Sequence, residues 1–84
     1  MKNELARSLL EGGCDAYEAG RYQLAASLFL RAARLGNGEA QINLANMYSD
    51  GAHGVDQDDK RASHWYRLAS SKGIPEAAYN LAFE

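Results

Sequence analysis

The chain of 84 residues contains one cysteine, one proline and no apolar run of the length that a membrane span requires. Cys14 has no second cysteine with which to form an internal disulfide, so nothing points to an oxidising compartment. A transmembrane helix needs roughly 20 apolar residues, and the opening residues lack the apolar core of a signal peptide. We therefore expect a cytoplasmic protein that does not associate with membranes.

An excess of charge of one sign is also missing. Nine Lys and Arg residues stand against eleven Asp and Glu residues, and the basic residues do not cluster. Nucleic-acid binding usually requires such a cluster, so we expect no nucleic-acid partner. No Gly-rich phosphate loop is present and no nucleophile has a recognisable catalytic context. We therefore predict that the chain is not an enzyme and uses no cofactor.

The spacings typical of metal ligands are absent as well. Cys14, His53 and His64 form neither a Cys-x-x-Cys nor a His-Glu-x-x-His pattern. The acidic run at 56–59 lacks the glycine and the glutamate that a calcium loop of the EF-hand type needs further along. We predict no metal site and interpret Cys14 as a small packing residue.

The main positive feature of the sequence is an internal repeat. Residues 39–45 read EAQINLA, and residues 76–82, which begin 37 positions later, read EAAYNLA. A self-similar period in this range is typical of a stacked repeat array. Alanine is abundant and β-branched residues are few, which favours helix throughout.

Apolar spacing predicts four helices, at 3–19, 21–35, 38–50 and 57–72, and Pro75 opens a fifth. Asn37 and Asp56 are the expected N-caps of the third and fourth helices. The core stripe of the second helix recurs 37 positions later in the fourth: Ala25, Leu28, Phe29 and Ala32 become Ala62, Trp65, Tyr66 and Ala69. The second and fourth helices are therefore the same element in successive repeats. The aromatic side chains Tyr22, Trp65 and Tyr66 have core spacing, and we interpret them as packing residues.

Two irregularities distinguish the repeats. The pair Gly12-Gly13 interrupts the first helix, so either that helix bends there or a neighbouring helix comes close. The connection after Gly51 is six residues longer than the turn after Gly20, and we expect Val55 in it to pack beneath the helices.

Residues 40–77 resemble a Sel1-like repeat, which is a variant of the tetratricopeptide repeat. The matching residues are Ala40, Leu44, Ala45, Tyr48, Gly51, Gly54, Val55, Asp58, Lys60, Ala62, Trp65, Tyr66, Ala69, Gly73 and Ala77. The first repeat is similar to an ordinary tetratricopeptide repeat through Gly20, Tyr22, Ala25, Phe29 and Ala32, and it departs from both patterns at Gly12-Gly13. The resemblance implies an all-α fold, a right-handed α-solenoid of antiparallel helix pairs with about two repeats plus one extra C-terminal helix.

We predict a single domain over residues 1–84, with one repeat at about 3–36, a second at about 38–73 and a partial third at about 75–84. The resemblance implies a non-catalytic adaptor or scaffold that binds a protein or peptide partner. The concave face, lined by the odd-numbered helices, is the expected binding surface.

Candidate partner-binding residues are the side chains of the odd-numbered helices that point away from the core: Asp15, Glu18, Ile42, Asn43, Asn46, Ser49, Asp50, Tyr79, Asn80 and Phe83. Asn43 and Asn80 occupy the same repeat position, and a carboxamide offers a donor and an acceptor to an extended peptide. The alternative is a structural role, in which the uncapped C-terminal helix meets further repeats or a second copy of the chain.

Overall fold

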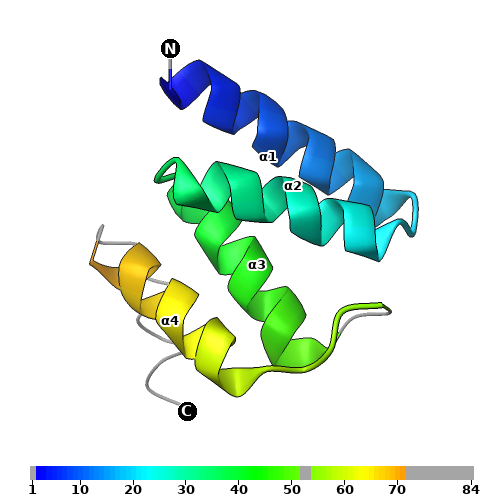
Figure 1. Ribbon diagram of the computed structural model, residues 1–84. Helices are drawn as coiled ribbons and strands as arrows, with labels where there is room; N and C mark the ends of the chain where they lie inside the picture. The colour runs from blue at the N-terminus through cyan, green and yellow to red at the C-terminus, as the bar shows by residue number, and fades with distance from the viewer. Residues whose placement is uncertain (1, 52–53, 72–84) are drawn as a thin grey trace.

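The computed structural model describes residues 2–51 and 54–71, which form four helices in two antiparallel pairs (Figure 1). In the first pair, α1 (Lys2–Glu18) packs against α2 (Tyr22–Arg34). In the second, α3 (Gly38–Asp50) packs against α4 (Asp59–Ser70), and the contact of α2 with α3 stacks the pairs.

These four helices, with no strand among the described residues, confirm the all-α helical-repeat fold. None of them is long and apolar enough to cross a membrane. The fifth helix predicted from Pro75 lies outside the described residues.

Glycine ends both α1 and α2, as predicted. Gly20 and Gly36 have φ angles of +78° and +93°, which glycine adopts without steric cost. After Gly20, the Arg21 N–H donates to the Ala16 carbonyl at 2.8 Å, which satisfies an otherwise unpaired carbonyl of the last helical turn. The bond from the Asn37 N–H to the Ala32 carbonyl, at 3.1 Å, repeats this geometry at the end of α2.

One of the two predicted N-caps is confirmed and the other is wrong. The Asn37 side chain accepts a hydrogen bond from the Ala40 N–H at 2.8 Å, as expected for the start of α3. In α4 the cap is Asp58 and not Asp56, because the Asp58 side chain accepts from the Arg61 N–H at 3.1 Å. The Asp58 N–H also donates to the Tyr48 carbonyl at 2.8 Å, so contact with α3 fixes where α4 begins.

The core alternates small and large side chains, which lets the helix backbones approach closely. Its fully covered small residues are Ala25, Ala32, Ala40, Ala45, Ala62 and Ala69, and its large ones include Phe29, Leu44, Met47 and Tyr66. The predicted stripes of α2 and α4 are confirmed, with Leu28 and Trp65 half-buried. Leu24, also on α2, is 45% exposed, because it lies on the side of the helix away from this core.

Gly13 marks a close approach of α1 and α2. A Cβ atom at this position would lie 2.6 Å from two ring carbons of Phe29, a distance that side chains do not tolerate. A Cβ at Gly12 would meet Leu28 at 3.4 Å, which is an ordinary contact. Of the two explanations for the glycine pair, the close approach therefore accounts for Gly13, and α1 continues through it without interruption.

The long connection between α3 and α4 is held on both sides. The Gln23 side chain of α2 donates to the Gly54 carbonyl at 3.1 Å, and the Gln57 side chain donates to the Ser49 carbonyl at 3.1 Å. Val55 is half-buried against the core, as predicted. The described part of the connection, from Gly54 onward, is thus packed against the preceding repeat as well as its own.

Candidate functional site

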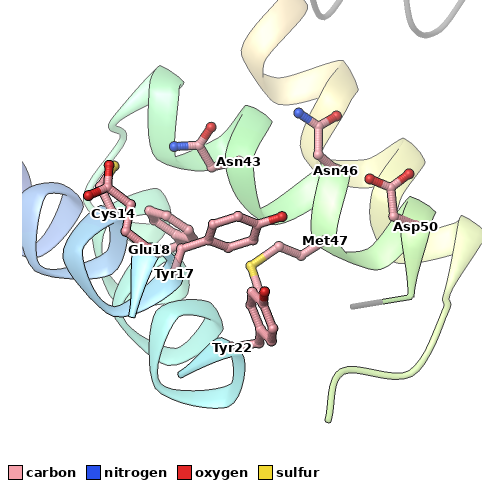
Figure 2. Close-up of a pocket in the computed structure, with 9 residues that line it drawn as sticks. Cys14, Tyr17, Glu18, Tyr22, Asn43, Asn46, Met47 and Asp50 are labelled. Atoms are coloured by element: carbon pink, nitrogen blue, oxygen red, sulfur yellow. The ribbon is translucent and has the colours of Figure 1, made fainter. Parts of the chain in front are cut away.

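A cavity of about 530 Å³ opens between α1, α2 and α3, and we call it the α1–α3 groove (Figure 2). Both helix pairs contribute to it. Its lining residues are Cys14, Tyr17 and Glu18 from α1, Tyr22 and Phe29 from α2, and Asn43, Asn46, Met47 and Asp50 from α3. The groove therefore depends on how the two pairs stack.

Helical periodicity explains which residues reach the groove. On α3, Asn43, Asn46, Met47 and Asp50 follow the spacing i, i+3, i+4, i+7, which places them in one stripe. On α1, the shorter set of Cys14, Tyr17 and Glu18 follows i, i+3, i+4. Two helix stripes thus face each other and form the walls.

The groove has an apolar floor and a polar rim. Phe29 and Met47 are each only 3% exposed and form the deep surface. Tyr17, which is 46% exposed, lies edge-to-face against Tyr22, with ring centroids 4.9 Å apart and an interplanar angle of 70°. The carboxylates of Glu18 and Asp50 are exposed on the α1 and α3 walls respectively.

A hydrogen bond from α4 fixes the orientation of the Asn46 side chain. The buried Tyr66 of α4 donates its hydroxyl hydrogen to the Asn46 Oδ1. Because the amide oxygen is engaged in this way, the two N–H donors of the Asn46 carboxamide remain for the groove. Tyr66 is therefore both the core residue that the sequence predicts and a support for a groove residue.

The electrostatic environment of the groove is negative. The described residues that line the groove include two carboxylates and no Lys, Arg or His. The pKa of the Cys14 thiol is raised, first by burial and then by the nearby carboxylates of Glu18, Asp15, Glu39 and Glu11. Across residues 2–51 and 54–71, no group of three or more His, Cys, Asp and Glu side chains is arranged to hold a metal ion.

The structure brings four of the predicted site residues together in this groove: Glu18, Asn43, Asn46 and Asp50. Three others lie elsewhere. Asp15 is exposed on α1 outside the lining, Ile42 packs against the core of the second pair, and Ser49 uses its carbonyl to hold Gln57. The remaining three, Tyr79, Asn80 and Phe83, lie outside the described residues.

Sequence reasoning missed the other five lining residues: Cys14, Tyr17, Tyr22, Phe29 and Met47. Tyr22 was interpreted as a packing residue, and it does pack against the core while its remaining surface lines the groove. The spacing of Tyr17 and Glu18 from Cys14 is a signal that could have placed these α1 residues on one wall.

Comparison with known families agrees with the two-pair architecture. The Sel1 repeat family matches residues 3–37 and 38–74, which together make up most of the chain. The chain belongs to the Sel1 repeat family. Its first Sel1 repeat contains α1 and α2 and its second contains α3 and α4, so the first repeat matches despite Gly12-Gly13.

Sel1 repeats are commonly protein-interaction modules of a non-catalytic type. Neither a curated protein nor a solved structure matches this chain. A binding surface on this Sel1 repeat chain is therefore to be sought in its own geometry.

Proposed function

We propose that this Sel1 repeat chain is a non-catalytic adaptor or scaffold that binds an extended segment of a partner protein in the α1–α3 groove. The observation that carries the proposal is the convergence of three helices from both repeats on one cavity of about 530 Å³. That volume is within the range of about 300 to 1,000 Å³ that is usual for binding pockets. The proposal includes the expected cytoplasmic location, which subcellular fractionation tests.

The groove offers the chemistry that an extended peptide requires. Asn43 and Asn46 are one helical turn apart on the same wall, and their carboxamides can bond successive polar groups of a peptide backbone. The buried surfaces of Phe29 and Met47 can receive one apolar side chain of the peptide. Backbone recognition by amides and anchoring on an apolar floor together favour a peptide over a small polar metabolite.

The test begins with peptides selected from a random library displayed on phage, with the intact chain as bait. Amide chemical shifts in an NMR titration with a selected peptide should change at the residues that line the groove. Asn43→Ala removes one backbone contact and should weaken binding about fivefold, the equivalent of about 1 kcal/mol.

Ser27→Ala provides the matched control, because Ser27 is exposed on α2 and does not line the groove. It should bind the peptide with unchanged affinity. Equal affinity of Asn43→Ala and the unmodified chain, with both folded by circular dichroism, would contradict the assignment of the groove.

The alternative function is assembly, either within a longer repeat array or as a homo-oligomer through the predicted C-terminal helix. The side chains on which it depends, Tyr79, Leu81 and Phe83, lie outside the described residues. Sedimentation at high micromolar concentration tests the homo-oligomer directly, since a strict monomer would remove it.

A further inference from the structure

We propose that the partner segment is basic, with an Arg or Lys side chain that lies against the Tyr17–Tyr22 ring pair between the carboxylates of Glu18 and Asp50. This inference rests on the proposed function and narrows its partner class from any extended segment to one with a cationic side chain. Three features of the groove support it: its charge, its exposed aromatic surface and its apolar floor.

The two rim carboxylates belong to opposite walls, Glu18 to α1 and Asp50 to α3. Within the described residues neither of them forms an ion pair, while Asp58 elsewhere is engaged by Arg61 at 3.4 Å. Among residues 2–51 and 54–71, no basic side chain lines the groove. A cation that enters therefore meets a groove with a carboxylate at either end, whereas a phosphate or carboxylate group is repelled (Figure 2).

The Tyr17–Tyr22 ring pair is a second feature of the groove that favours a cation. In the edge-to-face arrangement of Tyr17 and Tyr22, Tyr17 remains 46% exposed, which leaves ring surface open to a ligand. The faces of aromatic rings attract cations, and the flat guanidinium of arginine stacks on them better than an ammonium does. Arginine can also hold a carboxylate through two parallel hydrogen bonds. We therefore expect arginine more often than lysine.

The apolar floor of the groove can accommodate the methylene part of an Arg or Lys side chain. Long basic side chains bury their methylene stems against apolar surface while the charged group stays at the rim. Phe29 and Met47 provide that surface below the tyrosines. At the Cys14 end of the groove, four carboxylates act together with burial to raise the pKa of the thiol, so the negative potential extends beyond the two rim residues.

The experiment uses the intact chain and a random 12-residue peptide library displayed on phage. Selected peptides should share an arginine or lysine, and replacement of that residue by glutamine should weaken binding about fivefold or more. The double variant Glu18→Gln, Asp50→Asn should lower affinity for the parent peptide about fivefold, since a partly exposed ion pair contributes up to about 1 kcal/mol.

The matched control is Glu4→Gln, Asp56→Asn, which removes two exposed carboxylates that do not line the groove. Its affinity should change less than twofold. An equal loss in both double variants would show attraction to net charge alone, and it would overturn the inference.

Two further outcomes separate the inference from the function on which it rests. If selected peptides lack basic residues, shift the groove resonances and bind the Glu18→Gln, Asp50→Asn variant normally, the basic partner class is wrong and the binding groove stands. If every selected peptide shifts resonances on another face, the proposed function itself fails.

Discussion

The two Sel1 repeats have the same arrangement of helices but carry different side chains at equivalent positions. Phe29 of α2 corresponds to Tyr66 of α4, and Gly13 of α1 corresponds to Leu44 of α3. In the first repeat, the absence of a side chain at Gly13 makes room for the Phe29 ring. In the second, Leu44 is fully buried at that position.

The same comparison separates the functions of the repeats in the groove. Asp15 is the first-repeat equivalent of Asn46, and because Phe29 has no hydroxyl, it cannot hold Asp15 as Tyr66 holds Asn46. Asp15 is exposed outside the groove, whereas Asn46 lines it. The first repeat supplies the aromatic surface, and the second supplies Met47 of the floor and the amides, one of them fixed in orientation by a buried hydroxyl.

Of the variants that test this comparison between the repeats, Gly13→Ala is expected to have the largest effect on stability. The new methyl would lie 2.6 Å from the ring of Phe29, which is buried and has little room to move. We expect the free energy of unfolding to fall by about 2 kcal/mol, as is typical of an overpacked core. Urea denaturation followed by circular dichroism measures it.

Gly12→Ala is the control for that change, because its methyl has only an ordinary contact with Leu28. It should stabilise the chain by up to about 1 kcal/mol through helix propensity. Similar stabilities for the two variants would contradict the close approach at Gly13.

The next largest effect on stability is expected when Gln41 is replaced. Gln41 is 3% exposed, and its amide group donates to the Ala33 carbonyl at 3.1 Å. Its Oε1 is buried and has no hydrogen-bond partner within the described part of the chain. Gln41→Ala leaves the Ala33 carbonyl without this donor and opens a cavity, so the free energy of unfolding should fall by about 1.5 kcal/mol.

The equivalent residue of the first repeat is Leu10, so Gln41→Leu makes the repeats alike. This variant also loses the donor to the Ala33 carbonyl, which still accepts from the Gly36 N–H at 3.0 Å. It keeps the volume and removes the unsatisfied oxygen, and we expect a change below about 0.5 kcal/mol. Thermal denaturation of both variants checks the difference. Equal losses of stability in Gln41→Ala and Gln41→Leu would show that side-chain volume at this position does not determine stability.

A smaller effect is expected from Tyr66→Phe, which gives the second repeat the side chain of the first. Loss of the hydrogen bond to Asn46 should cost about 1 kcal/mol of stability. Because Asn46 is then free to rotate, affinity for a groove peptide should fall about threefold without any change to a lining residue. Isothermal titration calorimetry measures the affinity, and Trp65→Phe is the control because Trp65 does not line the groove.

The smallest effect concerns Cys14, whose second-repeat equivalent is Ala45. Because the folded chain raises the pKa of the thiol above its ordinary value of 9.0, folding favours the protonated form. The resulting stability is present below that value and is lost as pH rises through it toward the raised pKa. Denaturation between pH 7 and pH 10.5 should show a decline that Cys14→Ala reduces, and an identical decline in both would contradict it.

Local signals in the sequence were enough to predict most of the fold. The helix stripes, the stops at Gly20 and Gly36 and the cap at Asn37 each depend on residues a few positions apart. The start of α4 was misplaced because it depends on a bond from Asp58 to Tyr48 of α3, which no local pattern records. Asp56 and Asp58 are equally good caps by residue type alone.

The prediction covered most of the α3 wall of the groove but only Glu18 of the α1 wall. Helical periodicity placed Asn43, Asn46 and Asp50 on the outer side of α3, and the structure gathers them there. It could not show that Tyr22, at the start of α2, reaches the same cavity, because that depends on how α1 crosses α2 beside Gly13. Nor could it show that Tyr66 supports Asn46 from a helix twenty residues later.

Two glutamines cross the boundary between the repeats in opposite directions. Gln23 of the first repeat bonds Gly54 of the second, and Gln41 of the second bonds Ala33 of the first. Neither repeat can therefore open without breaking a bond that belongs to the other. In native-state hydrogen exchange, amides of α2 and α3 should share one opening free energy, so that the unit of folding is the pair of repeats rather than either repeat alone.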